Sequence, residues 1–538
     1  GITSYTNDAD GRLIAVQNGS GKALSYTLDA VGNRLLLLDC DNGLTSYSWD
    51  TQNRLTGIVN PYNETTTISW DALNRELHRV LGNGMSVSHG YDAAGRETLV
   101  GAWGPAGAAL AMFSRTYDSA GNRTSVVELD GTRVTYGYDS SYQLINEQRS
   151  GANAYNTSYS YDGPGNRLTK NDSGALTSYS YNAANELTVL QPPTGQPTSS
   201  SWDGAGNLAV ENTGGSLTSY TWDSENRLTG VANPDATSET HVYSADNMRQ
   251  KKVTAAGTVI FVRDGQNVLI ETDGSGVTQA HYTDFPGMWG GLASQRRGTA
   301  SSFYGFDSQQ SSRVLVSVAG LVTDSYSYKA FGEELAAGSG TTNAMRYVGA
   351  LGYYRDIVNR IYVRARHLRA DLGRWISRDP ARATQSRSNR YWYVSNRPVR
   401  AFDPTGRVLS QVPDTSMQWN LGPDPTDSGD FYGCTGSFKT QWHIVPHAAR
   451  RGQSGCERGW LIQKVDFTAS ECTCDPGGPC GYLDQFPVTY WEAVGENGVT
   501  AGTEFEIDIF SFHGGGDETL GGASETGELR FYCNIHNK

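Results

Sequence analysis

The chain has 538 residues, 18% of them charged and 11% aromatic, with a formal net charge of −13. That length exceeds one ordinary hydrophobic core, so two or more structural units are expected. The negative charge argues against a general nucleic-acid binder, and no stretch reaches the roughly 20 apolar residues of a membrane-crossing helix.

An aromatic residue followed by Asp returns about every 21 residues along the first half of the chain. A fixed period of this length predicts a repeat architecture, in which each unit buries its apolar side against its neighbours. The repeating positions are Asp8, Asp29, Asp50, Asp71, Asp92, Asp118, Asp139, Asp162, Asn182, Asp203, Asp223 and Ser244.

Each repeat is predicted to form one β-hairpin. Alternating stretches such as 45–49 and 177–181 are rich in Thr, Tyr and Trp and are typical of half-buried strands. The Gly-Asn and similar pairs that follow supply the positive-φ positions of tight turns. We expect each Asp to cap its own turn by accepting N–H groups two or three residues on; a calcium site at Asp8 and Asp10 is the alternative.

Hairpins laid side by side make a long strip of antiparallel sheet, which twists and coils. A coiled strip of this kind can enclose a space. The repeats are regular over 1–250 and irregular over 251–345, where strand-turn units such as 304–307 and 326–332 continue the same pattern. The expected fold class is therefore all-β.

Residues 346–407 form a strongly basic segment with 14 Arg, no Lys and 4 acidic residues, whereas 408–538 carry 7 basic and 18 acidic residues. Opposite charges of similar size suggest that the two segments face each other. Alternatively, the arginines satisfy carbonyl and carboxylate groups within a tightly packed plug.

The remaining chain divides into a linker at 408–430, marked by Pro413, Pro423 and Pro425, and a small domain at 431–538. An even, dense set of cysteines in such a domain predicts disulfides and an oxidising compartment. A zinc site formed by four of them is the alternative. The six disulfide candidates are Cys434, Cys456, Cys472, Cys474, Cys480 and Cys533, and the four zinc candidates among them are Cys456, Cys472, Cys474 and Cys480.

No catalytic motif is complete in 408–538. His443 and His447 are spaced as on one helix face, but Pro446 interrupts the helix and no Glu follows the first His. We therefore expect a small β domain without cofactor, metal or turnover activity, with strands near 503–512 and 528–533. A nuclease-like site remains the alternative, drawn from His443, His447, His513, His536, Asp466 and Asp508.

The repeats and the basic segment together resemble the RHS/YD-repeat proteins and their RHS-associated core domain. The resemblance covers about 1–407 and implies a hollow shell, or cocoon, with the core at 346–407 as an inward plug. In Tc-toxin C components and bacterial RHS effectors the following sequence is often an enclosed toxin, whereas teneurin shells serve adhesion. The matching stretches are 304–332, 349–354, 364–366, 373–375, 377–380, 389–396 and 403–406.

The resemblance also implies self-cleavage by two aspartates acting as in aspartic peptidases. The matching residues are Asp379 and Asp403, with Arg378 beside the first, and the cut would fall just after Gly406, between Arg407 and Val408. Such a pair works because two close carboxylates do not both ionise.

This sequence departs from the family pattern at three places. The first motif reads Asp-Pro-Ala-Arg without the usual Gly, Arg407 stands where Leu is common, and 366–370 replaces an Arg-Tyr-Tyr-Asp-Pro stretch. The alternative interpretation is that Asp379 and Asp403 cap turns in an inactive plug.

The expected function is that of a secreted or surface-exposed shell, which encloses or displays its C-terminal domain and cuts itself after the core. An extracellular adhesion or structural protein with an inactive core is the alternative. The expected partners are the C-terminal domain itself, glycans or cell-surface proteins, and a preceding region, because Gly1 falls within a repeat.

Overall fold

The computed structural model describes residues 3–287, 290–338, 340–380 and 389–407, and the backbone of the strands named below beyond 407. The chain forms two compact units, residues 1–380 with 388–418, and residues 381–387 with 419–538. The described part has no α-helix, only the 3₁₀ turns η1 (Gly349–Leu351) and η2 (Val394–Asn396). No helix in this part is long and apolar enough to cross a membrane.

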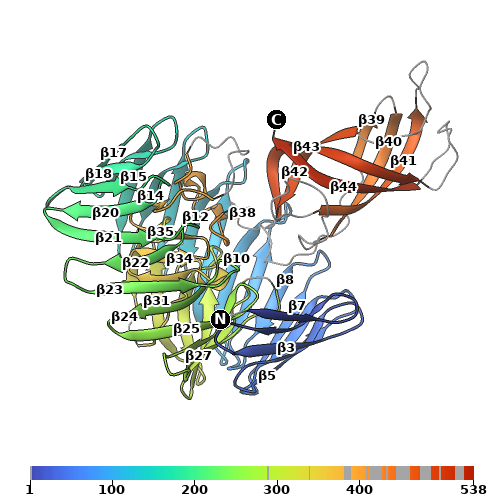
Figure 1. The fold of residues 1–538 in the computed structure, drawn as a ribbon, viewed down its shortest axis with the longest axis horizontal. Helices are drawn as coiled ribbons and strands as arrows, with labels where there is room; N and C mark the ends of the chain where they lie inside the picture. The colour runs from blue at the N-terminus through green and yellow to red at the C-terminus, as the bar shows by residue number, and fades with distance from the viewer. Residues whose placement is uncertain are drawn as a thin grey trace. The chain divides into compact units, whose positions relative to one another are not determined.

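The first unit is built on a 32-stranded antiparallel strip, called the wall here, in which each strand pairs with the next along the chain (Figure 1). Its first sixteen strands are β1 (Ser4–Asn7), β2 (Leu13–Gln17), β3 (Ala23–Leu28), β4 (Arg34–Leu38), β5 (Leu44–Trp49), β6 (Leu55–Val59), β7 (Thr65–Trp70), β8 (Glu76–Val80), β9 (Ser86–Tyr91), β10 (Glu97–Trp103), β11 (Ala109–Tyr117), β12 (Arg123–Glu128), β13 (Arg133–Tyr138), β14 (Leu144–Arg149), β15 (Tyr155–Tyr161) and β16 (Arg167–Asp172).

The wall continues with β17 (Ala175–Tyr181), β18 (Leu187–Gln191), β19 (Thr198–Trp202), β20 (Leu208–Thr213), β21 (Ser216–Trp222), β22 (Leu228–Ala232), β23 (Ser238–Tyr243), β24 (Arg249–Thr254), β25 (Gly257–Asp264), β26 (Asn267–Thr272), β27 (Thr278–Thr283), β28 (Ser294–Arg297), β29 (Ala300–Phe306), β30 (Ser312–Ser317), β31 (Val322–Tyr328) and β32 (Glu334–Ala337). The expected all-β fold of hairpin repeats is confirmed.

The repeated Asp closes one turn of each repeat in which it occurs. At Asp50, Oδ1 accepts the N–H groups of Gln52 and Arg54 at 2.9 and 3.0 Å, and Oδ2 accepts Arg54 Nε–H at 2.7 Å. Asn53 supplies the positive φ, at 60°. The capping expected from the sequence is confirmed, with the second N–H four residues on. Asp8, the residue for which calcium binding was the alternative, forms the same kind of turn. Both of its carboxylate oxygens accept hydrogen bonds from Arg12.

From Asp50 onward, an aromatic residue precedes each repeated Asp and ties one repeat to the previous one. Trp49 Nε1–H donates to the carbonyl of Arg34 at 2.8 Å, and Tyr161 O–H donates to the carbonyl of Leu144 at 2.7 Å. The register shifts at this residue, as between Ser48 and Trp49, so the ring reaches across the pleat. Either Trp or Tyr can make this bond, because each has an apolar ring that carries a hydrogen-bond donor at its far end.

The wall coils so that residues far apart in sequence meet. Tyr5 O–H donates to Asp246 Oδ2 at 2.7 Å across 241 residues. Farther along, Arg313 Nη2 donates to Glu128 Oε1 at 2.8 Å across 185 residues. Early and late hairpins of the strip therefore lie beside each other in two passes, which side-chain contacts hold together.

The core, residues 346–407, packs against the wall within the same unit. Its small sheet consists of β33 (Tyr354–Ile357), β34 (Arg360–Val363), β35 (Arg366–Arg369) and β36 (Arg374–Trp375), and β37 (Ala401–Phe402) pairs with β38 (Ser410–Gln411). One hydrophobic cluster joins wall residues Leu144 and Tyr159 to core residues Val363 and Trp375.

The second unit contains a six-stranded antiparallel sheet in the order β39-β40-β41-β44-β43-β42. Its strands are β39 (Asp427–Phe431), β40 (Cys434–His443), β41 (Leu461–Cys472), β42 (Phe486–Gly495), β43 (Gly498–Gly514) and β44 (Thr526–Asn537). The strands expected near 503–512 and 528–533 correspond to β43 and β44.

Candidate functional site in the core

The turn after β37 carries Asp403 and precedes the expected cleavage point. Gly406 N–H donates to the Asp403 carbonyl at 3.2 Å, and Arg407 N–H donates to Asp403 Oδ1 at 2.9 Å. These are the bonds that the repeated Asp makes in the wall. The core therefore reuses the local turn chemistry of the repeats, and the sequence Asp-Pro-Thr-Gly is sufficient to predict it.

The segment between β34 and β35 holds this turn from one side. Ala365 N–H donates to the Thr405 carbonyl at 3.1 Å, Arg364 Nη1 donates to the Pro404 carbonyl, and Arg366 Nε donates to the Gly406 carbonyl. Arg364 lies in the turn between these two strands, with φ 48°, and Arg366 is the first residue of β35. Both side chains reach the Asp403 turn.

Tyr353 holds the turn from the other end. Its hydroxyl donates to the Asp403 carbonyl and accepts the Asp403 N–H, both at 2.9 Å. Burial raises the pKa of Tyr353 well above its usual value, which keeps the hydroxyl a donor. The backbone of Asp403 is thus fixed by one buried side chain.

A single guanidinium brings the two predicted aspartates together. Arg366 Nη2 lies 3.1 Å from Asp379 Oδ2 and 2.9 Å from Asp403 Oδ2. The side chains of Arg366 and Asp403 are almost fully buried, whereas that of Asp379 is 16% exposed. The face of the Trp375 ring lies 4.2 Å from the Arg366 guanidinium carbon. The less buried carboxylate is therefore the one that water reaches more readily.

Arg378, expected beside the first aspartate, is exposed and lies beside Gly206 of the wall. Neighbouring side chains of an extended segment point to opposite sides. Because Arg378 and Asp379 are adjacent in sequence, their side chains point away from each other. The backbone of Asp379 is held instead by Arg390, whose carbonyl accepts its N–H at 3.0 Å and whose Nη2 donates to its carbonyl at 2.7 Å. Sequence reasoning missed Arg366 as the arginine of this site.

The expected cleavage point falls at the end of the described turn. Arg407 is partly buried, and Val408 lies outside the described residues. The chain resumes at β38, whose Ser410 pairs with Phe402 of β37. The bond between Arg407 and Val408 therefore belongs to the loop that joins these two short strands.

This arrangement supplies groups that peptide hydrolysis requires. A carboxylate can activate water, and a guanidinium can stabilise negative charge that develops on a carbonyl oxygen. Asp379 is the more accessible carboxylate. Arg366 donates to the Gly406 carbonyl, which belongs to the peptide bond one residue before the expected cut, so this contact positions the chain. The same contacts also suit a purely structural clamp, since each charge has a partner.

A second cluster of the core, formed by His241, Asp356 and His367, has ligand atoms within 4.8 Å of one another. The carboxylate is already engaged, by Arg249 at 2.7 Å and by Lys252 at 3.0 Å. Two cations at this distance oppose a divalent metal ion. Burial lowers the pKa of His367 to about 3, in keeping with a neutral ring among cations.

The arginines of the core pair with carboxylates of the wall. Arg360 Nη2 lies 2.5 Å from Glu239 Oε2, and Arg369 Nη1 lies 2.9 Å from Glu211 Oε2. These contacts favour the plug interpretation of the basic segment. The side chains of 408–538, and with them the expected charge match, lie outside the described residues.

Among the cysteines, Cys40 is free and partly buried, and burial raises its pKa to about 11. The side chains of the six disulfide candidates and of the nuclease-like candidates lie outside the described residues. The strand register sets Cys434 opposite Cys472.

Comparison with known proteins identifies the repeats. The model of the family "RHS Repeat" matches residues 202–238. The chain is similar to a solved Photorhabdus luminescens Tc holotoxin pore with a mutated TccC3, at 18% identity and a TM-score of 0.62, over 75% of this chain and 23% of that one.

It is also similar to the crystal structure of TcdB2-TccC3-Cdc42, at 18% identity and a TM-score of 0.57, over 76% of this chain and 24% of that one. The chain thus spans about a quarter of the solved chains that it matches. At this identity the likeness establishes the fold. No curated protein matches the chain.

Proposed function

We propose that this chain, an RHS-repeat protein with the fold of Tc-toxin shells, is the shell of a secreted or surface-exposed protein that encloses or displays residues 408–538. In this proposal the core cuts the chain between Arg407 and Val408. The observation that carries it is the contact of one Arg366 nitrogen with both Asp379 and Asp403.

The proposed chemistry assigns one role to each of these groups. Asp379, the more exposed carboxylate, takes a proton from a water molecule that attacks the Arg407 carbonyl carbon, and it passes this proton to the Val408 nitrogen as the bond breaks. Arg366 and Asp403 fix the peptide that precedes Arg407, through its carbonyl oxygen and its N–H. Arg366 takes the place beside Asp379 that the sequence suggested for Arg378.

Self-cleavage is tested by the intact mass of the purified chain. We expect two fragments that meet at 407/408 instead of one species of 58.3 kDa, and a single species in Asp379→Asn and Asp403→Asn. Asp50→Asn alters a wall turn of the same build and is the matched control, which should still be cut. An uncut wild-type chain would refute this part of the proposal.

A second candidate function is supported by the local geometry of Asp403. Because this carboxylate caps its own turn as the wall aspartates do, the core also fits an inactive plug in an extracellular adhesion or structural protein. The uncut wild-type chain is the result that this candidate predicts. Its expected partners are glycans or cell-surface proteins.

Exposure to an oxidising compartment is tested by peptide mapping without reduction. We expect linked peptides among the six cysteines of the C-terminal unit, with Cys434 joined to Cys472, because the strand register sets them opposite each other. Free thiols at all six positions would count against secretion and surface exposure alike.

A further inference from the structure

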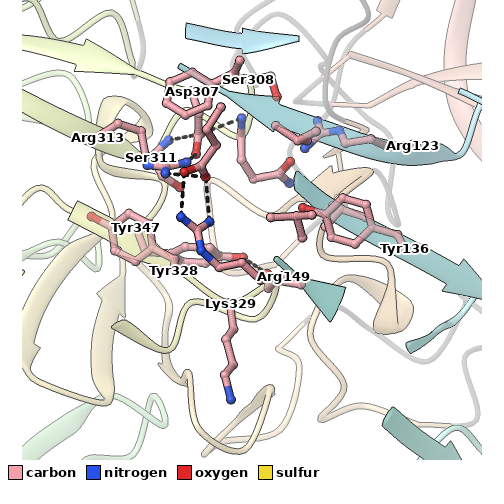
Figure 2. Close-up of a pocket in the computed structure, with 17 residues that line it drawn as sticks. Arg123, Tyr136, Arg149, Asp307, Ser308, Ser311, Arg313, Tyr328, Lys329 and Tyr347 are labelled. Carbon is pink, nitrogen blue, oxygen red and sulfur yellow. Dashed lines mark hydrogen bonds and ion pairs between the residues drawn. The ribbon is translucent and has the colours of Figure 1, made fainter. Parts of the chain in front are cut away.

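A cavity of about 50 Å³ lies between the wall and the core, away from Asp379 and Asp403 (Figure 2). Strands β12 and β13 form one side of it, and the turn at 307–311 with β30 and β31 forms another. Tyr347 and Val399 of the core close it. The cavity is therefore complete only while the core rests against the wall.

Two of the arginines that line the cavity are neutralised by two carboxylates. Arg149 binds Glu128 through both Nη atoms, at 2.8 and 2.7 Å. Arg313 binds Glu128 at 2.8 Å and Asp307 at 3.2 Å. Figure 2 shows Arg149, Asp307 and Arg313 together on one side of the cavity.

The other two cations that line the cavity differ in their pairing. Lys329 forms an ion pair with Asp172, and Figure 2 shows its side chain directed away from the arginines. Arg123 is 5% exposed, and its Nε has no hydrogen-bond partner. The nearby carboxylate of Asp307 acts on Arg123 electrostatically but is already paired with Arg313. One positive charge at the cavity therefore has no carboxylate of its own among the described residues.

Arg123 is exceptional among the nine arginines that are buried in the described part of the chain. Each of the other eight makes a side-chain hydrogen bond, an ion pair or a cation–π contact with a described residue, whereas Arg123 makes none. Burial of a guanidinium without a direct partner is costly. A ligand that reached this guanidinium would offset that cost.

The groups around Arg123 indicate what that ligand is. Figure 2 shows Arg123 and Tyr136, from neighbouring strands, pointing into the same space. No described residue bonds to the Tyr136 hydroxyl, which leaves a second donor. Gln309 Oε1, also at the cavity, is a buried acceptor without a partner.

We propose that this cavity binds a small monovalent oxyanion that carries an O–H group, such as hydrogencarbonate. One negative charge balances Arg123, the oxygens accept from Arg123 and Tyr136, and the O–H donates to Gln309. A few heavy atoms fit about 50 Å³, since one water needs roughly 10–15 Å³ of such space. The ligand stabilises the docked core, and this role does not depend on self-cleavage.

The test measures the thermal unfolding of the full chain at constant ionic strength while hydrogencarbonate replaces gluconate, which is too large for the cavity. We expect the midpoint to rise for the wild type, with the folding equilibrium shifted about 100-fold at 100 times the dissociation constant. Formate, which lacks the O–H group, should shift it less.

Variants locate the effect. Arg123→Gln should remove the dependence on hydrogencarbonate, and Tyr136→Phe should weaken it about fivefold. Arg133→Gln, at an exposed arginine of the next strand, is the matched control and should behave as the wild type. Should Arg123→Gln not fold, Tyr136→Phe decides alone. A flat wild-type response, or equal responses in all variants, would overturn the proposal.

Discussion

The turn at Asp50 in the wall and the turn at Asp403 in the core share their local bonds but differ in the arginine that completes them. Asp50 receives Arg54, four residues on in its own turn, at 2.7 Å. Asp403 receives Arg366 from a distant strand, at 2.9 Å. A local partner makes a turn that can be repeated anywhere, whereas a distant partner makes a turn that exists only in the folded core.

Burial distinguishes an exposed ion pair of the wall from a pair that joins the wall to the core. Arg227 and Glu225 form a wall pair whose carboxylate is 58% exposed, whereas Arg249 and Asp356 join wall to core with both side chains fully buried. Exposed pairs contribute about 0–1 kcal/mol. Breaking a buried pair leaves a charge without a partner, which costs much more.

The largest effect is therefore expected from Asp356→Asn. Among the described residues, loss of the carboxylate leaves Arg249 buried without an ion-pair partner and Lys252 with only Glu239, at 3.8 Å. We expect the unfolding free energy to fall by about 3–5 kcal/mol. Denaturant unfolding measures it, with Glu225→Gln as the exposed control within about 0.5 kcal/mol of the wild type. Equal losses in the two variants would remove the distinction between wall and core.

An intermediate effect is expected from the glycines that end the two kinds of turn. Gly406 has φ +70°, and a Cβ there would lie 2.3 Å from the Val363 carbonyl oxygen, whereas Gly121 has φ +77° with no atom within 4 Å. We expect Gly406→Ala to cost about 3 kcal/mol and Gly121→Ala about 1 kcal/mol, the latter from backbone strain alone. Thermal unfolding of both variants measures the two losses. A smaller loss of stability for Gly406→Ala than for Gly121→Ala would show that the core turn is loosely packed.

The smallest effect is a pH dependence of opposite sign in the two regions. Burial lowers the pKa of His367 in the core to about 3, so the unfolded chain binds the extra proton below about pH 6.5 and stability falls with acidification. In the wall, burial opposes but Glu97 and Glu76 outweigh it, raising the pKa of His89 to about 9. The contribution of His89 is complete below about pH 6.5 and is lost as pH rises toward 9.

On the acid limb, set by His367, and on the alkaline limb, set by His89, the unfolding free energy changes by about 1.4 kcal/mol per pH unit. Urea unfolding between pH 5 and 9 measures both limbs. We expect His367→Gln to flatten the acid limb and His89→Gln the alkaline limb. A variant that flattened the wrong limb would reverse the assignment.

The wall could be predicted from the sequence because its bonds are local. The Asp turn and the aromatic donor both lie within about one repeat, so a period of about 21 residues indicates the hairpin, its cap and its link to the preceding repeat. The coil contacts, such as Tyr5 with Asp246, depend on how far the strip curves. Nothing in the period specifies that curvature.

The candidate site was only half predictable for the same reason. Asp379 and Asp403 stand in short motifs, but the arginine that joins them comes from β35. The available signal was the pair Arg364 and Arg366, which lie at the hairpin turn between β34 and β35. Choosing Arg378 by adjacency overlooked the alternation of side chains along an extended segment.

The coil also fixes how many repeats separate two hairpins that contact each other. Contacts between its two passes span 241 residues at Tyr5, 185 at Arg313 and 163 at Lys170, so each partner is matched to one particular hairpin of the other pass. Inserting or deleting one hairpin between two contacting residues would shift every later contact between the passes by one hairpin. Growth of such a wall must therefore occur at an end, or in both passes at once.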